Sequence, residues 1–378
     1  MINITRKEDC CGCEACRQAC PKQCIEIKAD EQGFVYPIVD ASICIDCHLC
    51  ERVCPTINQA MHRTPQATFA ATNIDSETKY RSSSGGVFFA LAKSVIEQGG
   101  VVFGVKFDEN WQVVHSWADT LDGVKVFQGS KYVQSRIGDS FTQVQRFLNE
   151  GRKVMFTGTP CQIAGLRLFL RKDYGEQLLL VDVACHGTPS PLVWNEYLKH
   201  QANGRNITGI SFRDKRNGWV KYGMCITYQD HDEFFQPMSQ NLYMQGFLHD
   251  IYLRPSCFKC PSKAGKSGSD ITLADFWGIQ QHYPELYAKG YYSLVLANTQ
   301  LGNQILRLLS KVEFCKTDFY LAIKNNPALV HSVMRPKLAT YFWNIFASRK
   351  IEAIQLSLNK LKPSFFVRII RKIKRRIL

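Results

Sequence analysis

The sequence predicts two structural classes in one chain, a small cysteine-rich module followed by a larger α/β body with a mixed sheet. Three observations support this. Eight cysteines lie in two identically spaced runs within the first 54 residues. After residue 68, apolar runs of strand length alternate with helical patterns. The chain has 378 residues, of which 45% are hydrophobic, and this is enough for two or three domains.

Each cysteine run reads C-x2-C-x2-C-x3-C-P, the spacing of bacterial ferredoxins with two 4Fe-4S clusters. In that pattern the fourth cysteine of one run ligates the other cluster. We therefore predict two 4Fe-4S clusters and a short hairpin around Gly33 that covers them. The first cluster would use Cys10, Cys13, Cys16 and Cys54, and the second Cys44, Cys47, Cys50 and Cys20.

A pair of zinc knuckles is the alternative for these runs, since C-x2-C also suits zinc. Zinc requires neither a third cysteine two residues later nor a fourth before Pro21 and Pro55. The repeated pattern therefore favours iron–sulfur clusters. Cys11 and Cys24 fall outside the pattern, and we interpret them as packing thiols.

The formal net charge of +14 is concentrated near the C-terminus, where eight Lys or Arg lie between Lys360 and Arg376. Without these eight the charge is +6, an ordinary excess, so we predict no nucleic-acid partner. The start of the chain, MINITRKEDCCGC, contains no apolar signal region. We expect a cytoplasmic protein, whose cysteines serve metal sites or catalysis rather than disulfides.

The body begins after a polar, proline-broken linker at residues 55–68. We expect strands at 68–72, 101–107, 112–118, 153–159, 178–185 and 271–276, and helices at 85–98, 138–149 and 160–170. The predicted domains are a two-cluster ferredoxin domain at 1–60, two parts of one α/β domain at 67–150 and 151–340, and a helical basic tail at 341–378.

Three turns between a strand and a helix are candidate sites, because α/β folds bind ligands there. The segment Ser82–Gly86 could cradle a phosphate or flavin, although a serine cap with a tight turn is an equal alternative. Cys161 opens a helix, which would lower its thiol pKa, whereas a buried packing thiol is the alternative. Cys185 and His186 follow a buried strand.

Cys257 and Cys260 form a later C-x2-C pair. Together with Cys161 and Cys185 they supply four cysteines, enough for a third 4Fe-4S cluster. The neighbouring AGKSG is no P-loop, because the first glycine of that motif would fall at Cys260. Asp275, Trp277 and Gly278 follow a short strand and could line a ligand, whereas a core tryptophan is the alternative.

Several motifs in order resemble the beta-subunit family of coenzyme F420 hydrogenases and dehydrogenases. They are SSSGG, GSKYVQS, GTPCQIAGL, CHGTPSP, FRDK and GW between 212 and 219, and C-x2-C followed by SDITLADFWG. The resemblance covers roughly residues 1–290 and includes the attached double ferredoxin. It implies an iron–sulfur oxidoreductase with FAD in a mixed-sheet flavin domain.

The resemblance also implies site residues. The flavin candidates are Ser83, Ser84, Gly85, Gly86, Lys131, Thr159 and Pro160. The candidates for the third cluster are Cys161, Cys185, Cys257 and Cys260. In many bacteria relatives occur among polysaccharide genes, where a sugar or lipid-linked intermediate would be the substrate; the sequence neither supports nor excludes this role.

The last residues, 364–378, read SFFVRIIRKIKRRIL, with apolar residues every four positions and basic residues between them. This is typical of a basic amphipathic helix on an anionic membrane surface. A terminal helix packed on the body, or a disordered end, is the alternative. The pattern favours peripheral attachment to the inner face of the membrane.

Two functions follow from these features. In the first, electrons from the clusters reach FAD, which reduces or oxidises a small-molecule substrate, and His186 or Lys131 handles protons. In the second, the protein is an electron-transfer subunit that docks on a catalytic partner and has no substrate site. Both require a redox partner, such as a ferredoxin or a reductase.

Overall fold

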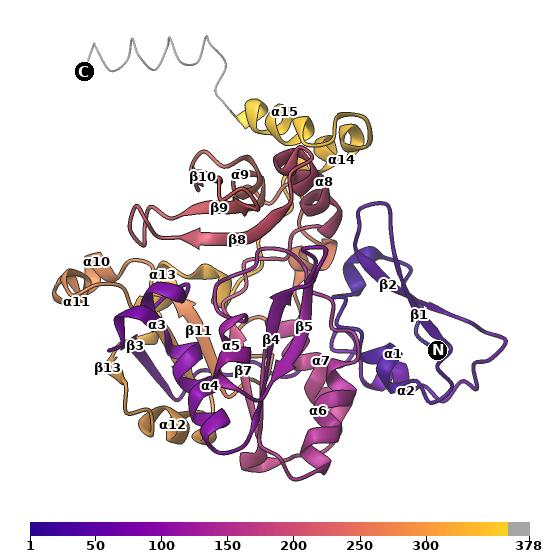
Figure 1. Ribbon diagram of the computed structural model, residues 1–378. Coiled ribbons are helices and arrows are strands. Elements are labelled where there is room, and N and C mark those ends of the chain that lie inside the picture. The colour runs from indigo at the N-terminus through magenta and orange to yellow at the C-terminus, as the bar shows by residue number, and fades with distance from the viewer. Residues whose placement is uncertain (362–378) are drawn as a thin grey trace.

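The computed structural model describes residues 1–361 and has three parts (Figure 1). The small module at the N-terminus packs beside an α/β body built on an eight-stranded mixed sheet, and a smaller three-stranded sheet lies next to that body. The mixed α/β class predicted from the sequence is confirmed.

The N-terminal module repeats one motif twice. Helix α1 (Ala15–Ala19) starts after Glu14 and helix α2 (Leu49–Arg52) after His48, and both preceding residues have a φ of 58°. Between them lies the predicted hairpin of β1 (Ile25–Ala29) and β2 (Val35–Val39). Gly33 has a φ of +79° in the hairpin turn, a conformation that glycine adopts without strain. A 3-10 turn, η1, covers Lys7–Asp9.

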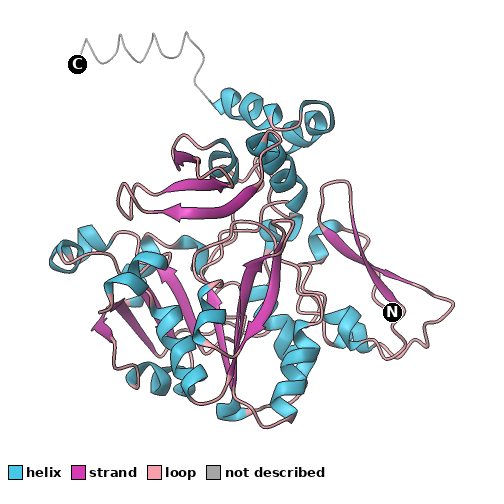
Figure 2. Cartoon of the chain, in the orientation of Figure 1, coloured by secondary structure: helices cyan, strands magenta, loops and turns pink. Residues whose placement is uncertain are grey.

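The large sheet has the strand order β13-β3-β12-β11-β7-β6-β4-β5, and Figure 2 shows its strands between layers of helices. Its centre, β11-β7-β6-β4, is parallel, and the outer pairs are antiparallel. The strands are β3 (Ala67–Asn73), β4 (Val101–Phe107), β5 (Val113–Ala118), β6 (Val154–Gly158), β7 (Leu178–Val183), β11 (Ile271–Asp275), β12 (Ser293–Ala297) and β13 (Val312–Lys316). Strands from both predicted parts, 67–150 and 151–340, therefore share one sheet.

Separate apolar layers cover the sheet. One contains side chains from α4 and α12, the other side chains from α6 and α7. Helix α4 begins at Val87 rather than at the predicted residue 85, because Gly86 has a φ of +82°. The helices of the body are α3 (Ser76–Arg81), α4 (Val87–Glu97), α5 (Leu121–Lys125), α6 (Ser140–Asn149), α7 (Pro160–Leu170), α10 (Ile279–His282), α11 (Pro284–Ala288), α12 (Gln300–Arg307) and α13 (Phe319–Lys324), with 3-10 turns η2 (Gly175–Gln177), η3 (Pro255–Lys259) and η4 (Pro327–Leu329).

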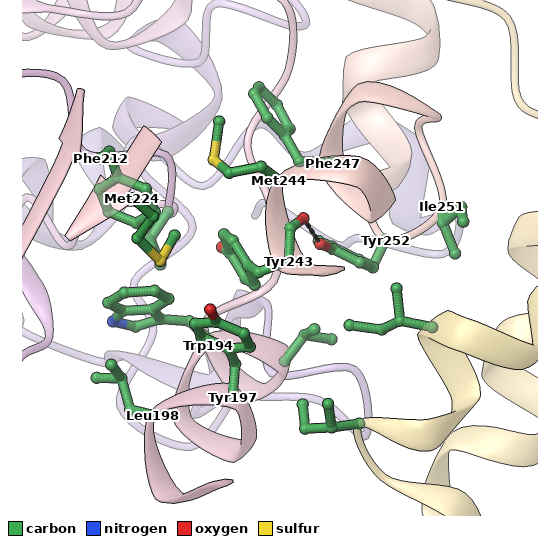
Figure 3. Close-up of a cluster of buried hydrophobic side chains, with 14 of the residues drawn as sticks. Trp194, Tyr197, Leu198, Phe212, Met224, Tyr243, Met244, Phe247, Ile251 and Tyr252 are labelled. Carbon is green, nitrogen blue, oxygen red and sulfur yellow. Dashed lines mark hydrogen bonds between the residues drawn. The ribbon is translucent and has the colours of Figure 1, made fainter. Parts of the chain in front are cut away.

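The second sheet, β10-β9-β8, was not predicted from the sequence. Its strands are β8 (Ile207–Asp214), β9 (Gly223–Tyr228) and β10 (Glu233–Pro237). Four helices pack with this sheet: α8 (Pro191–Ala202), α9 (Leu242–Leu248), α14 (Lys337–Arg349) and α15 (Glu352–Leu361). They share an aromatic core around Trp194, Tyr197 and Tyr243 (Figure 3). In this core the hydroxyl of Tyr252 donates to the carbonyl oxygen of Tyr243.

The module shares a core with the body. Cys11, Cys13 and Ala15 belong to the same buried cluster as α6 and α7. A Cβ atom at Gly165 of α7 would lie 2.9 Å from the sulfur of Cys13, so glycine permits this close approach. The two parts are therefore packed as one structure.

The predicted basic helix at 364–378 lies outside the described residues. Within residues 1–361, none of the helices has the length and apolar character needed to cross a membrane.

Candidate iron–sulfur sites and the flavin candidates

The eight cysteines of the two runs line two cavities, divided as the crossed pattern predicts. Cys20, Cys44, Cys47 and Cys50 line one cavity at the end of the module, and we call them the tip set. Cys10, Cys13, Cys16 and Cys54 line a second cavity nearer the body, and we call them the junction set. In the described part of the chain, no three His, Cys, Asp or Glu side chains are close enough to bind one metal ion. Iron–sulfur ligation by each set stays a prediction.

The two sets differ in exposure. Cys13, Cys16 and Cys54 of the junction set are buried, whereas only Cys50 of the tip set is. Backbone N–H groups of the module donate to tip-set sulfurs, from Ile2 to Cys50 at 3.3 Å and from Asp46 to Cys44 at 3.4 Å. Four cysteine sulfurs around one space are the donor set of a 4Fe-4S cluster, so both sets fit that group.

Cys161, Cys185, Cys257 and Cys260 line a third cavity, and we call them the body set. Cys161 follows β6 and Cys185 follows β7. These strands are parallel neighbours, so both cysteines lie at the same edge of the sheet. The chain segment around η3 brings the other two cysteines there, and the N–H of Thr188 donates to the sulfur of Cys257 at 3.3 Å. The donor set suits a third cluster, which also stays a prediction.

The predicted lowering of the Cys161 pKa is wrong for this structure. A contact with the thiol of Cys11, together with burial, raises the Cys161 pKa well above its usual value, although Thr159 opposes this. Burial also raises the pKa of Cys257, and that of Cys260 to about 12. Burial disfavours the thiolates, although the charge of Lys263, which lines the cavity, opposes this at Cys260. A bound metal centre would deprotonate its cysteine ligands.

Cys11 lies between the junction set and the body set. It lines both cavities, and its thiol contacts Cys13 and Cys161. The packing role predicted from the sequence agrees with its burial, but its position shows more: the two cavities are separated by this side chain. Cys24 lines the tip cavity, with its sulfur 3.4 Å from that of Cys20.

His186 lines the body-set cavity, as its position after β7 suggests. Its Nε2 lies 2.6 Å from Oδ1 of Asp250, and its ring packs edge-on against Phe247. The carboxylate therefore orients the imidazole. This geometry permits proton transfer and also suits a purely structural role.

Two of the seven flavin candidates line the body-set cavity, and five do not. Thr159 and Pro160 line the body-set cavity, which Ser83, Ser84, Gly85, Gly86 and Lys131 do not. Ser84 donates to the carbonyl oxygen of Tyr292, and the N–H of Gly85 donates to Ser293. A Cβ atom at Gly85 would lie 2.3 Å from the carbonyl oxygen of Ala71. These contacts give the Ser-Gly loop a structural role, and flavin binding by this loop stays a prediction.

Lys131 makes contacts that suit a structural role. Its ammonium group donates to the carbonyl oxygens of Gln128 at 3.0 Å and of Val126 at 3.1 Å, just after helix α5. Burial lowers the pKa of Lys131 to about 7. A role in proton transfer stays a prediction.

A second cluster of polar and aromatic side chains covers the Ser-Gly loop. Arg213 pairs with Asp275 at 2.7 Å and donates to the carbonyl oxygen of Ser83 at 3.1 Å. Trp219 stacks between Trp277 and Tyr291, with ring centroids 5.0 and 6.0 Å away. Trp277, which follows β11, thus lies in a ring stack beside the loop.

Sequence reasoning missed the residues that join the module to the body. Glu14, with a buried side chain, accepts hydrogen bonds from Arg136 at 3.0 Å and from the N–H of Ile137 at 3.2 Å. Arg254 reaches from the body to the backbone of Cys10. Its position three residues before Cys257 was the only available signal in the sequence.

Comparisons with known proteins agree with the resemblance found in the motifs. Residues 9–58 match the model of the 4Fe-4S dicluster domain. Residues 151–318 match the model that describes the C terminus of the beta subunit of coenzyme F420 hydrogenase/dehydrogenase. The family resemblance predicted from the sequence is confirmed.

Two known proteins are similar to this chain. The chain is 22% identical over 190 residues to the F subunit of the F(420)H(2) dehydrogenase of Methanosarcina mazei, a match that covers 48% of this chain and about half (54%) of that protein. A chain of the F420-reducing [NiFe] hydrogenase complex from Methanosarcina barkeri is similar with a TM-score of 0.47 and 17% identity, over 80% of this chain and 93% of that chain.

Proposed function

We propose that this protein, which combines a dicluster module with the C-terminal region of the coenzyme F420 hydrogenase/dehydrogenase beta-subunit family, is an iron–sulfur electron-transfer subunit of an oxidoreductase complex. It would hold clusters at the tip, junction and body sets and pass single electrons between a redox partner and a catalytic partner. Catalysis on a small molecule would belong to the partner.

The observation that carries this proposal is the succession of three cysteine-lined cavities. The tip set is the more exposed, and three of the four junction-set cysteines are buried. Cys11 lines both the junction and body cavities. This arrangement gives an electron one route from the surface of the module to the ends of β6 and β7. Strand ends of parallel sheets are where ligands bind in α/β folds.

Iron–sulfur clusters supply one-electron transfer when they are bound, and the chain supplies their surroundings. The N–H groups that donate to sulfurs of the tip and body sets stabilise added negative charge there. Gly165 holds the junction set against α7, and the Glu14–Arg136 ion pair holds α1 in place. The residues therefore fix the relative positions of the three sites.

A flavin enzyme with its own small-molecule substrate is the second candidate. The ring stack of Trp219, Trp277 and Tyr291 favours it, because aromatic faces suit a planar group. The neighbouring Arg213 is already paired with Asp275. FAD, a substrate from polysaccharide synthesis and proton transfer by His186 or Lys131 would belong to this candidate.

Membrane attachment through residues 364–378 is a separate proposal, tested by deleting 360–378 and measuring sedimentation with anionic vesicles.

Anaerobic purification followed by measurement of iron, sulfide and flavin distinguishes the two candidates. If the protein is an electron-transfer subunit, we expect bound clusters that a one-electron donor reduces rapidly. We also expect no turnover of a small molecule without a catalytic partner. Stoichiometric flavin together with partner-free turnover would support the second candidate. A preparation with no iron at the N-terminal cysteines would contradict both.

A further inference from the structure

Arg254 is a buried cation at the contact between the body and the N-terminal module. Arg254 is only 1% exposed to solvent. Its Nε donates to the carbonyl oxygen of Cys10 at 2.8 Å, and its Nη2 to that of Val35 at 2.9 Å. Its Nη1 donates to the side-chain oxygen of Gln134 at 3.0 Å. The guanidinium, which starts in the body, therefore ends among residues of the module.

These contacts satisfy the hydrogen bonds of Arg254 without neutralising its charge. Within residues 1–361, its acceptors are two backbone carbonyls, one amide oxygen and the sulfur of Cys10, and none is a carboxylate. The rings of Tyr36 and Phe34 lie 4.5 and 5.5 Å from the guanidinium carbon and add a weak attraction. Arginine stays charged in proteins, and a buried charge without a countercharge is costly. The countercharge must therefore come from a group held nearby.

The sulfur of Cys10 is the nearest candidate for that negative charge. Nη2 of Arg254 lies 3.5 Å from it. Gly12, two residues later, has a φ of +71°, and a Cβ atom there would lie 2.8 Å from Nη1 and 2.9 Å from the guanidinium carbon. The glycine between the cysteines thus leaves the space that Arg254 occupies. Cys10 belongs to the junction set, whose four thiolates would make a ligated cluster negative overall.

We propose that Arg254 is the fixed countercharge of the junction set and raises the reduction potential of a cluster bound there above that of the tip set. The inference rests on the proposed function, since it requires clusters at both sets. Each one-electron reduction adds one negative charge, which a permanent cation in a low-dielectric site stabilises. With clusters bound at both sets, one electron would pass from the tip set, whose cluster would be oxidised, to the junction set, whose cluster would be reduced, and no proton or further reactant would take part.

Arg254 reaches the sulfur of Cys10 from beside the junction cavity, whose lining includes the buried carboxylate of Glu14, paired with Arg136. Within residues 1–361, no buried cation donates to a sulfur of the tip set. Lys22 and Met1 line the tip cavity, but Lys22 is exposed, and the N-terminal ammonium of Met1 pairs with Asp46 and Glu51. Solvent and these carboxylates screen both positive charges. The difference in fixed charge therefore favours electron flow from the tip set to the junction set.

The test is a redox titration of the anaerobically purified full chain, followed by electron paramagnetic resonance. Two variants remove the charge effect in different ways: Arg254→Met deletes the cation, and Gln134→Glu keeps it but adds a carboxylate at its 3.0 Å contact. In both we expect one centre to become at least tenfold harder to reduce, which is about 59 mV for a one-electron couple. Arg254→Lys should move the same centre less, and Lys22→Met should leave it unchanged.

An unchanged potential in both charge variants, with iron content intact, would overturn the inference, as would an equal shift of every centre. If Arg254→Met loses the junction centre, Arg254→Lys must retain it, and loss in both would count against a role of charge. A wild-type protein without clusters at the two N-terminal sets would overturn the proposed function as well, and the iron analysis identifies that case.

Discussion

The tip set and the junction set have the same sequence spacing and different surroundings. The tip set takes its N–H donors from its own module and keeps three of its four cysteines partly exposed. The junction set is buried against α7 and receives a guanidinium from the body. Cysteine spacing therefore encodes two equal sites, and the second part of the chain makes them unequal. The packing of the body on the junction set, and not the cysteine spacing, would therefore set the direction of electron flow.

The largest effect is expected from Gly165→Leu. The added side chain would start 2.9 Å from the sulfur of Cys13 and push α7 away from the module. We expect loss of the junction centre, about four irons per chain, while the tip centre stays. Iron analysis with electron paramagnetic resonance measures this. Gly165→Ala should give an intermediate loss, and equal loss of both centres would show that the two sets are not held independently.

A smaller effect is expected from Glu14→Gln at the same contact. The carboxylate is buried and accepts from Arg136 and from the N–H of Ile137, so the variant weakens a charged hydrogen bond. We expect about 1 to 3 kcal/mol lower stability in chemical unfolding, and faster bleaching of the junction centre. The control is Glu26→Gln, whose exposed pair with Lys28 should matter by less than about 0.5 kcal/mol. Similar losses in both variants would contradict the account.

At the tip set, Ile45→Lys, which adds a positive charge, tests whether electrons are exchanged through the exposed side. Ile45 lines the tip cavity and is 57% exposed. Residues 1–58 contain six basic and nine acidic side chains, so a basic partner is expected to dock there. With cytochrome c as a basic probe, we expect roughly threefold to tenfold slower electron exchange in stopped flow. Exchange with a small dye should not change, and a variant as fast as wild type towards cytochrome c would place the entry elsewhere.

The smallest effect concerns pH and the body side of the junction. Burial lowers the pKa of His115 from 6.5 to about 4, and its backbone N–H donates to the carbonyl oxygen of Arg136. The unfolded chain therefore binds a proton between about pH 6.5 and 4 that the folded chain does not. Stability falls as pH drops through this window, by about 1 kcal/mol between pH 7.5 and 5.5.

His115→Phe should remove that part of the pH dependence, since it has no titrating group. Unfolding is measured at about pH 7.5 and 5.5, on either side of the ordinary histidine pKa, and the bleaching of the two N-terminal centres is followed separately. We expect the acid sensitivity of the junction centre to fall in the variant and that of the tip centre to stay. An unaltered difference between the two pH values would contradict the role of His115.

Much of the fold could be predicted because it depends on local patterns. The hairpin around Gly33 and the strands of the parallel centre follow from apolar runs bounded by turn residues. The sheet of β8 to β10 was missed, since its outer strands β8 and β10 are only partly buried and carry a weak alternation. Helix α4 starts late because Gly86 adopts a positive φ, which the sequence permits but does not require.

The site was predictable where spacing along the chain determines it. The crossed division of the eight cysteines follows from the motif. The family motifs pointed to the four cysteines of the body set as candidates for one site. The raised pKa of Cys161 was not predictable, because it depends on Cys11, 150 positions earlier. Arg254, Glu14 and Gln134 act across the contact between module and body, and no local pattern marks such contacts.

Iron content of the wild type beside a Cys161→Ser, Cys185→Ser double variant tests the central claim most directly. If electrons pass through three centres, the anaerobically purified wild type contains about twelve irons per chain and the variant about eight. The variant should still accept electrons at its N-terminal centres but should not transfer them to the catalytic partner. About eight irons in both proteins, with unchanged electron paramagnetic resonance signals, would contradict a centre at the body set and the route through it.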